Sequence, residues 1–113
     1  TRLGLDAARL WTTVDLTHCL WERLQPHDVI GDLAPTIAQF QVDDGRMGEH
    51  VHLPLLSPDW ALDLPGFTRW YQAAPCAGVP LMAELSRDAH RGAEMAAATI
   101  RALRDVGLVP AAR

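Results

Sequence analysis

The sequence predicts an α/β fold in which parallel strands alternate with helices. Three short apolar runs, at residues 11–16, 37–42 and 80–85, have the composition typical of strands. Helical patterns lie between or after these runs, and each run ends in polar residues of ligand-binding types. Because the carboxyl ends of parallel strands lie at one edge of a sheet, this arrangement predicts a site at that edge.

The segments between the strands differ in length. Residues 20–24 predict a short helical turn that ends before Pro26, and residues 26–35 predict a loop with weak helical character. The connection over residues 43–62 is expected to be a long loop, and loops of this length in a compact domain are usually functional or mobile.

Two amphipathic helices follow that connection. Asp63 is expected to cap the first, whose apolar face has helical spacing and comprises Phe67, Trp70, Tyr71 and Ala74. The last helix is predicted over residues 88–106, with an apolar stripe formed by Ala93, Ala96, Ile100 and Leu103. The resulting β-α-β-α-β-α order predicts parallel pairing through crossover connections.

Composition excludes several classes of protein. The 113 residues are enough for one small domain, and 49% apolar with 21% charged residues is typical of a soluble globular chain. A net charge of −4, with dispersed arginines and no lysine, argues against nucleic-acid binding. No apolar run approaches the ~20 residues that a membrane helix requires.

The two cysteines, Cys19 and Cys76, fit no Cys-x-x-Cys motif. We interpret both as free thiols in a reducing compartment, which predicts a cytoplasmic protein without a signal peptide. A disulfide between them is the less favoured alternative. Because the chain begins at Thr1 with what resembles the end of a helix, we expect it to be a piece of a longer protein.

Three polar residues stand at or near the predicted strand ends: Asp15, Gln41 and Glu84. Two carboxylates and an amide oxygen would suit Mg²⁺ or Mn²⁺ if the three strands are neighbours. His18, three residues after Asp15, is expected in the first loop as a further ligand or a substrate contact. The alternative is that Asp15 and Glu84 only cap the helices that follow them.

Asp43 and Asp44 follow the second strand, and paired carboxylates can perform acid/base chemistry when their pKa values differ. Of the two, we expect Asp44 to contact substrate, although such pairs more often cap a helix or face water. Arg46 is a second candidate substrate contact, for an anionic or hydroxylated ligand, with a solvated loop arginine as the equal alternative.

Glu49, His50 and His52 lie in the long connection, and two histidines at i and i+2 share one face of an extended segment. Metal sites sometimes use this spacing. Because no strong third ligand lies nearby in the sequence, we interpret both as polar loop residues, one of which remains a candidate substrate contact. Solvated positions are expected for His27 and His90, and core packing for Trp60, Trp70 and Tyr71.

The order of these motifs resembles a known family, the xylose-isomerase-like sugar phosphate isomerase/epimerase barrels. Residues 14–18 (Val-Asp-Leu-Thr-His) resemble the Asp-x-x-His strand end of that family. Residues 37–45 resemble its next strand, and residues 62–67 with 78–84 resemble its closing Asp-Leu-x-x-Phe and Gly-to-Glu segments. The similarity covers nearly the whole chain.

The resemblance implies that residues 1–113 form one partial domain, comprising the last three strands of a TIM-type (β/α)₈ barrel and the helices that belong to those strands. The metal ligands of the family correspond to Asp15, Gln41 and Glu84, and a fourth, a glutamate, would precede Thr1. Glu84 would also serve in acid/base catalysis, and His18 would contact substrate.

Two departures from the family pattern affect what the resemblance implies. Gln41 stands where many members have a histidine ligand, and residues 56–60 replace the usual Pro-Gly-x-Gly segment. The resemblance alone therefore predicts neither a tight metal site nor the usual substrate loop.

We therefore expect a metal-dependent sugar or sugar phosphate isomerase or epimerase, which abstracts a proton next to a carbonyl group. Its cofactor would be Mn²⁺ or Mg²⁺, and its partner either the remainder of the barrel or a second copy of the chain. The alternatives are a non-enzymatic α/β module that binds a sugar or a partner chain, and a dehydratase or hydrolase with the same barrel.

Overall fold

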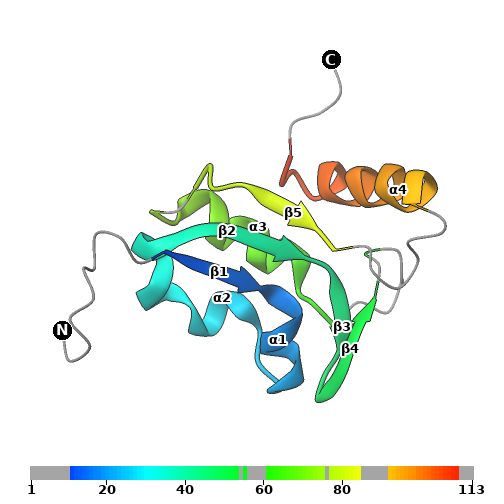
Figure 1. Ribbon diagram of the computed structural model, residues 1–113. Helices are drawn as coiled ribbons and strands as arrows, with labels where there is room; N and C mark the ends of the chain where they lie inside the picture. The colour runs from blue at the N-terminus through cyan, green and yellow to red at the C-terminus, as the bar shows by residue number, and fades with distance from the viewer. Residues whose placement is uncertain (1–10, 54, 56–60, 76, 85–91, 110–113) are drawn as a thin grey trace.

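The centre of the fold is a three-stranded parallel sheet (Figure 1). The computed structural model describes residues 11–53, 55, 61–75, 77–84 and 92–109. The strands are β1 (Thr12–Asp15), β2 (Ile37–Val42) and β5 (Leu81–Ala83), in the order β1-β2-β5. The mixed α/β class and the parallel pairing are as the sequence predicts.

Within the described ranges, four α-helices and one 3-10 helix accompany the sheet: α1 (Leu16–Trp21), α2 (Pro26–Val29), η2 (Gly31–Thr36), α3 (Leu64–Ala73) and α4 (Gly92–Asp105). The predicted cap of α3 is confirmed, because the Asp63 side chain accepts a hydrogen bond from the Gly66 N–H at 3.0 Å. No helix in the described ranges is both long and apolar enough to cross a lipid bilayer.

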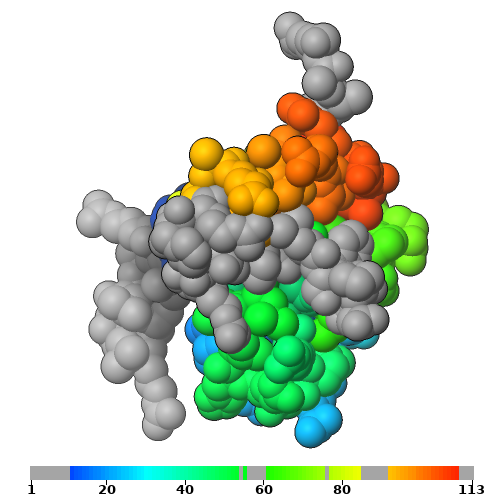
Figure 2. Space-filling view, turned by 90° about the vertical axis from the view of Figure 1, so that its right-hand side faces the viewer, coloured from blue at the N-terminus to red at the C-terminus, as the bar shows by residue number. Residues whose placement is uncertain are grey.

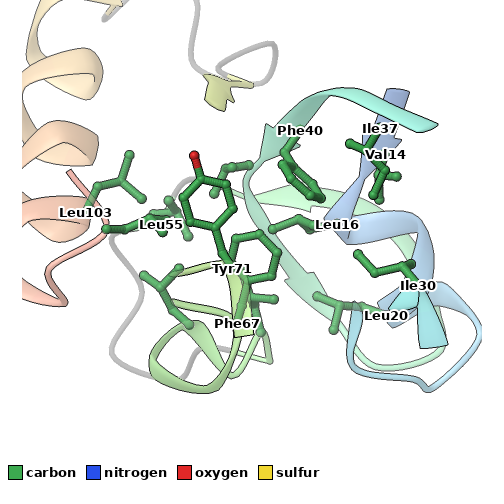
Figure 3. Packing of buried hydrophobic residues seen from close by; sticks show 14 of the residues in the cluster. Val14, Leu16, Leu20, Ile30, Ile37, Phe40, Leu55, Phe67, Tyr71 and Leu103 are labelled. Carbon is green, nitrogen blue, oxygen red and sulfur yellow. The ribbon is translucent and has the colours of Figure 1, made fainter. Parts of the chain in front are cut away.

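The main core lies between β2 and α3 (Figure 3). Phe40 is fully buried, and its ring meets those of Phe67 and Tyr71 edge to face at centroid distances of 5.4 and 5.8 Å. Trp70 adds a third edge-to-face contact at 6.2 Å. The prediction that Trp70 and Tyr71 belong to the core is therefore confirmed, and these rings hold α3 against one face of the sheet.

The opposite face of the sheet is more polar. Register neighbours share a face, and the row Asp15, Gln41 and Met82 runs across the three strands on the side away from Phe40. Met82 is 48% exposed, and Gln41 is half-buried. Asp15 is the last residue of β1, so this row lies close to the carboxyl edge of the sheet.

The expected long loop after β2 contains an antiparallel hairpin, so that part of the prediction is wrong. Strands β3 (Asp44–Arg46) and β4 (Glu49–Leu53) are joined by a two-residue turn, in which Gly48 has φ +75°. L side chains rarely adopt that conformation, whereas glycine does so readily. The sequence signal is weak because β3 has only three residues, Asp-Gly-Arg, and the polar-apolar alternation of β4 is limited to residues 50–53.

The hairpin packs closely on α1, and Figure 2 shows it at one end of the molecule, well separated from α4. The Gly48 N–H donates to the Leu20 carbonyl oxygen at 2.8 Å. Gly45 is buried, and a Cβ at this position would lie 2.8 Å from Cγ2 of Thr17. A residue without a side chain therefore allows β3 to approach the helix.

Two helices differ from prediction in their start or their buried face. Helix α1 begins at Leu16, directly after β1, so His18 is helical and not in a loop. In α4 the buried residues are Met95, Thr99, Ala102 and Leu103, whereas Ile100 is 39% exposed. The predicted stripe shares only Leu103 with this set, because the buried positions 95, 99 and 102 each lie one residue before the predicted positions 96, 100 and 103.

His27 is also less solvated than expected. Its side chain is 15% exposed, and Nε2 lies 3.4 Å from Asp63 Oδ2. Cys19 is a free thiol, as predicted. The expectations for Cys76, Trp60 and His90 lie outside the described residues, as does the segment 56–60.

Candidate functional site

Three potential ligand side chains meet at the carboxyl edge of the sheet. Asp15, His18 and His52 each offer one ligand atom, and these atoms all lie within 4.8 Å of one another. Asp15 is the last residue of β1, His18 lies in α1, and His52 lies in β4. We call these three residues the Asp-His-His cluster.

Asp15 has a different role for each of its oxygens. Oδ1 accepts a hydrogen bond from the Thr17 N–H at 3.0 Å and so caps α1. Oδ2 lies 3.5 Å from His18 Nε2 and 4.0 Å from His52 Nδ1. The alternatives of helix cap and ligand therefore do not exclude each other, because one carboxylate can serve both.

Asp43 stands behind the cluster, with a fully buried side chain. Its Oδ2 lies 2.5 Å from His52 Nδ1, and its Oδ1 accepts a hydrogen bond from the Thr17 hydroxyl. Burial raises the pKa of Asp43 from 3.8 to about 6, against the opposing effect of the Thr17 and His52 hydrogen bonds. The sequence prediction favours Asp44 over Asp43, although two adjacent carboxylates cannot be told apart without knowing which one faces the site.

Asp44 points elsewhere and is also buried. Its Oδ1 accepts hydrogen bonds from the backbone N–H groups of Ala61 and Leu62, at 3.1 and 3.0 Å. Burial raises its pKa as well. These contacts anchor the chain before α3, so the position gives no support to the expected substrate contact by Asp44.

The other predicted site residues are not members of the cluster. Gln41 is the register neighbour of Asp15, and Glu84 follows β5, with its N–H donating to the Val42 carbonyl oxygen at 3.3 Å. Arg46 belongs to the hairpin, where it forms an ion pair with Glu49 at 3.5 Å, and both side chains are more than half exposed. Arg46 therefore already has an acidic partner at the surface.

His52 is the functional candidate that sequence reasoning underestimated. The spacing of His50 and His52 is the available signal, but it indicates two side chains on one face only if residues 49–53 form a strand. In β4, both residues reach Trp21 of α1: its ring stacks on His50 at 4.6 Å and meets His52 edge-on at 5.3 Å. His18 stacks on Trp21 at 4.1 Å.

The cluster carries an electrostatic bias toward cations. Partial burial lowers the pKa of His52, but its hydrogen bond to Asp43 and the charges of Asp43, Asp15 and Glu84 outweigh this and raise it above the ordinary value. Three carboxylates therefore act on one imidazole. Such an environment stabilises a positive charge, whether that of a proton or of a metal ion.

The metal-free protein should lose stability as the pH rises. Native Asp43, with a pKa near 6, binds a proton more tightly than the unfolded chain, so its contribution is present below pH 4 and is lost on passing through pH 6. His52, also raised, adds a loss of the same sign above its unfolded pKa. Between pH 4.5 and 7, Asp43 alone accounts for about 2 kcal/mol.

Urea unfolding with EDTA present, at several pH values, measures this dependence. The variant Asp43→Asn cannot titrate, so its unfolding free energy should vary less with pH than that of the wild type. Parallel pH profiles for the two proteins would contradict the prediction.

The donor set can be tested against the expected divalent metal. One carboxylate and two imidazoles suit Mn²⁺, Fe²⁺, Co²⁺ or Zn²⁺ better than Mg²⁺, which prefers oxygen ligands. Three protein ligands would leave positions for water or substrate, and the His18 side chain is 56% exposed, so solvent reaches this ligand. The residues therefore fit a catalytic type of metal site, with Mn²⁺ favoured over Mg²⁺.

Comparisons of the chain with protein-family models, with curated proteins and with solved structures found no match.

Proposed function

We propose that this chain is the C-terminal part of a TIM-type barrel that acts as a metal-dependent isomerase or epimerase of sugars or sugar phosphates. The observation that carries the proposal is the Asp-His-His cluster at the carboxyl edge of a parallel sheet. Active sites of β/α barrels lie at this edge.

The sheet itself supports a larger assembly. Among the described residues, β1 and β5 each pair with one strand only, and the face that carries Gln41 and Met82 is not packed as the Phe40 face is. Parallel sheets are normally covered on both faces, and open edges favour further pairing. The remaining strands would come from a longer polypeptide or from a second copy.

The proposed chemistry divides between the metal and the residues around it. A bound metal ion would polarise the substrate carbonyl group and stabilise the enediolate. Glu84, which follows β5, would remove the proton next to that carbonyl, and His18 would hold the metal together with Asp15 and His52. Gln39 and Gln41, which form no side-chain hydrogen bond within the described ranges, would offer amide groups to substrate hydroxyls.

The first test is metal binding, measured by titration calorimetry with Mn²⁺ alone. Replacing His52 with asparagine should weaken Mn²⁺ binding at least about 10-fold, because one of three ligands is lost. His50→Asn is the matched control, since His50 lies in the same strand and on the same tryptophan but outside the cluster. Equal affinities for the two variants would contradict the assignment of His52.

The second test is proton abstraction in the full-length protein. D-Fructose and D-xylulose, with and without a terminal phosphate, are incubated in D₂O with Mn²⁺, and deuterium at the carbon next to the carbonyl is followed by NMR. Glu84→Gln should lower the exchange rate at least about 100-fold without unfolding the protein. Glu49→Gln, a change in an exposed ion pair, should exchange as the wild type does.

These outcomes separate the candidate functions. Exchange that survives in Glu84→Gln would exclude Glu84 as the base. Sugar binding by the wild type without any exchange would favour the non-enzymatic sugar-binding module.

A further inference from the structure

The sheet face that carries Gln41, which we call the Gln41 face, is more polar than the faces of parallel sheets usually are. Two register pairs lie on it, Thr13 with Gln39 and Asp15 with Gln41. Phe40, between the two glutamines, points into the core on the other side. Packing of further strands would favour valine, isoleucine or leucine at such positions. The composition of this face therefore needs another explanation.

The side-chain amides of Gln39 and Gln41 are available to a ligand. Both residues are half-buried, and neither side chain forms a hydrogen bond within the part of the chain that the structure describes. Each amide offers two donor sites and one acceptor, and burying it without partners costs free energy. Apolar strands packed on this face would impose that cost at both positions. A polar ligand suits the Gln41 face better.

The charges near this face disfavour a phosphate group. Asp43, Asp15 and Glu84 all lie close enough to His52 to raise its pKa, so carboxylates surround the carboxyl edge of the sheet. The chain has no lysine, and within the described ranges β1, β2 and β5 contain no arginine. A phosphate dianion on the Gln41 face would be repelled by these carboxylates without a cation from the strands to offset them.

The spacing of the polar positions indicates the length of the ligand. Gln41 is level with Asp15 of the Asp-His-His cluster, and Gln39 lies about 6.6 Å further from it along β2. An extended carbon chain covers this distance in about five bonds. In a six-carbon ketose, about five bonds also separate the carbonyl carbon from the last hydroxyl oxygen. A sugar of this size would reach from the cluster to Gln39.

We propose that the Gln41 face binds an uncharged open-chain sugar of about six carbon atoms, with Gln41 near its carbonyl end and Gln39 with Thr13 at its last hydroxyl group. The inference rests on the proposed isomerase or epimerase function and selects sugars over sugar phosphates within it. Amides and hydroxyls both donate and accept, as sugar hydroxyls do. A site that hydrogen-bonds a hydroxyl group discriminates strongly against a ligand that lacks it.

The first test compares D-fructose with D-fructose 6-phosphate in the deuterium-exchange assay on the full-length protein. The kcat/KM of the wild type should be at least about 10-fold higher for D-fructose, because the phosphate meets like charges. Gln39→Arg places a cation at the far end of the sugar. It should shift the ratio of the two kcat/KM values toward the phosphate at least about 10-fold.

The second test uses the length of the sugar. Gln39→Leu removes the donor and the acceptor at similar size, and should lower kcat/KM for D-fructose about 10-fold. D-Erythrulose is too short to reach Gln39, so its kcat/KM should not change. Gln72→Leu is the matched control, since this exposed glutamine belongs to α3 on the other side of the sheet, and both sugars should react as with the wild type.

The outcomes separate this inference from the proposed function. A wild-type preference for D-fructose 6-phosphate, or equal effects of Gln39→Leu on the long and the short sugar, would overturn the inference and leave the proposed function standing. A loss of unfolding free energy in Gln39→Leu with unchanged kcat/KM would also overturn it, because the glutamine would then pair with protein groups. Absence of exchange with every sugar would overturn the proposed function, and this inference with it.

Discussion

Replacing Asp15 with serine is expected to leave the fold intact and to weaken Mn²⁺ binding at least about 100-fold. Serine is a good N-cap residue, so its hydroxyl can accept the Thr17 N–H that Asp15 Oδ1 accepts now. It has no second oxygen to replace Oδ2, which faces His18 and His52. The substitution therefore separates the two roles of one carboxylate.

Urea unfolding and Mn²⁺ calorimetry on the same samples provide the two readouts. Asp15→Ala is the reference variant, because it removes the ligand and the cap together and should cost about 1 kcal/mol of stability. Wild-type affinity in Asp15→Ser would remove Asp15 from the metal site. A stability loss equal to that of Asp15→Ala would show that serine does not replace the cap.

Replacing Phe40 with alanine should destabilise the protein by about 3–5 kcal/mol, the largest stability effect that we expect from one core residue. The side chain is fully buried and meets the rings of Phe67, Trp70 and Tyr71. Its removal leaves a cavity between β2 and α3 and loses three edge-to-face contacts.

Met82→Ala is the matched control, because Met82 lies in the neighbouring strand on the opposite face and is 48% exposed. Chemical denaturation should show a loss for Met82→Ala well below that for Phe40→Ala. Similar losses would mean that the Gln41 face of the sheet is packed in solution, as it would be against further strands.

The elements that could be predicted are those whose signal is local. The strand at residues 37–42 has the predicted bounds, and Asp63 begins α3 as its capping pattern indicates. The parallel order follows from strands that alternate with helices. In each case neighbouring residues decide the outcome.

The hairpin could not be predicted, because its stability comes from distant contacts. Val51 accepts a hydrogen bond from Trp21 Nε1 at 3.4 Å, and Gly48 donates to the carbonyl oxygen of Leu20. Neither contact leaves a trace in the spacing of residues 43–53. Tertiary packing on α1 therefore overrides a weak strand propensity.

A residue of the candidate site could be predicted from the sequence only where the element that carries it could be predicted. Asp15 follows from a strand end, whereas His52 reaches the cluster only through the hairpin. Asp43 and Asp44 are adjacent and chemically identical, and the alternation of a strand that ends at Val42 does not say which of them faces His52. The direction of the chain after that strand decides this.

The stacking of Trp21 has a consequence for the free energy of ligand binding. The indole lies between His18 and His50, with nearly parallel rings on the His50 side at an interplanar angle of 15°. A histidine that is already held against an aromatic surface loses less rotational freedom when it binds an ion. The aromatic stack thus preorganises His18, the most exposed member of the cluster, before any ligand arrives.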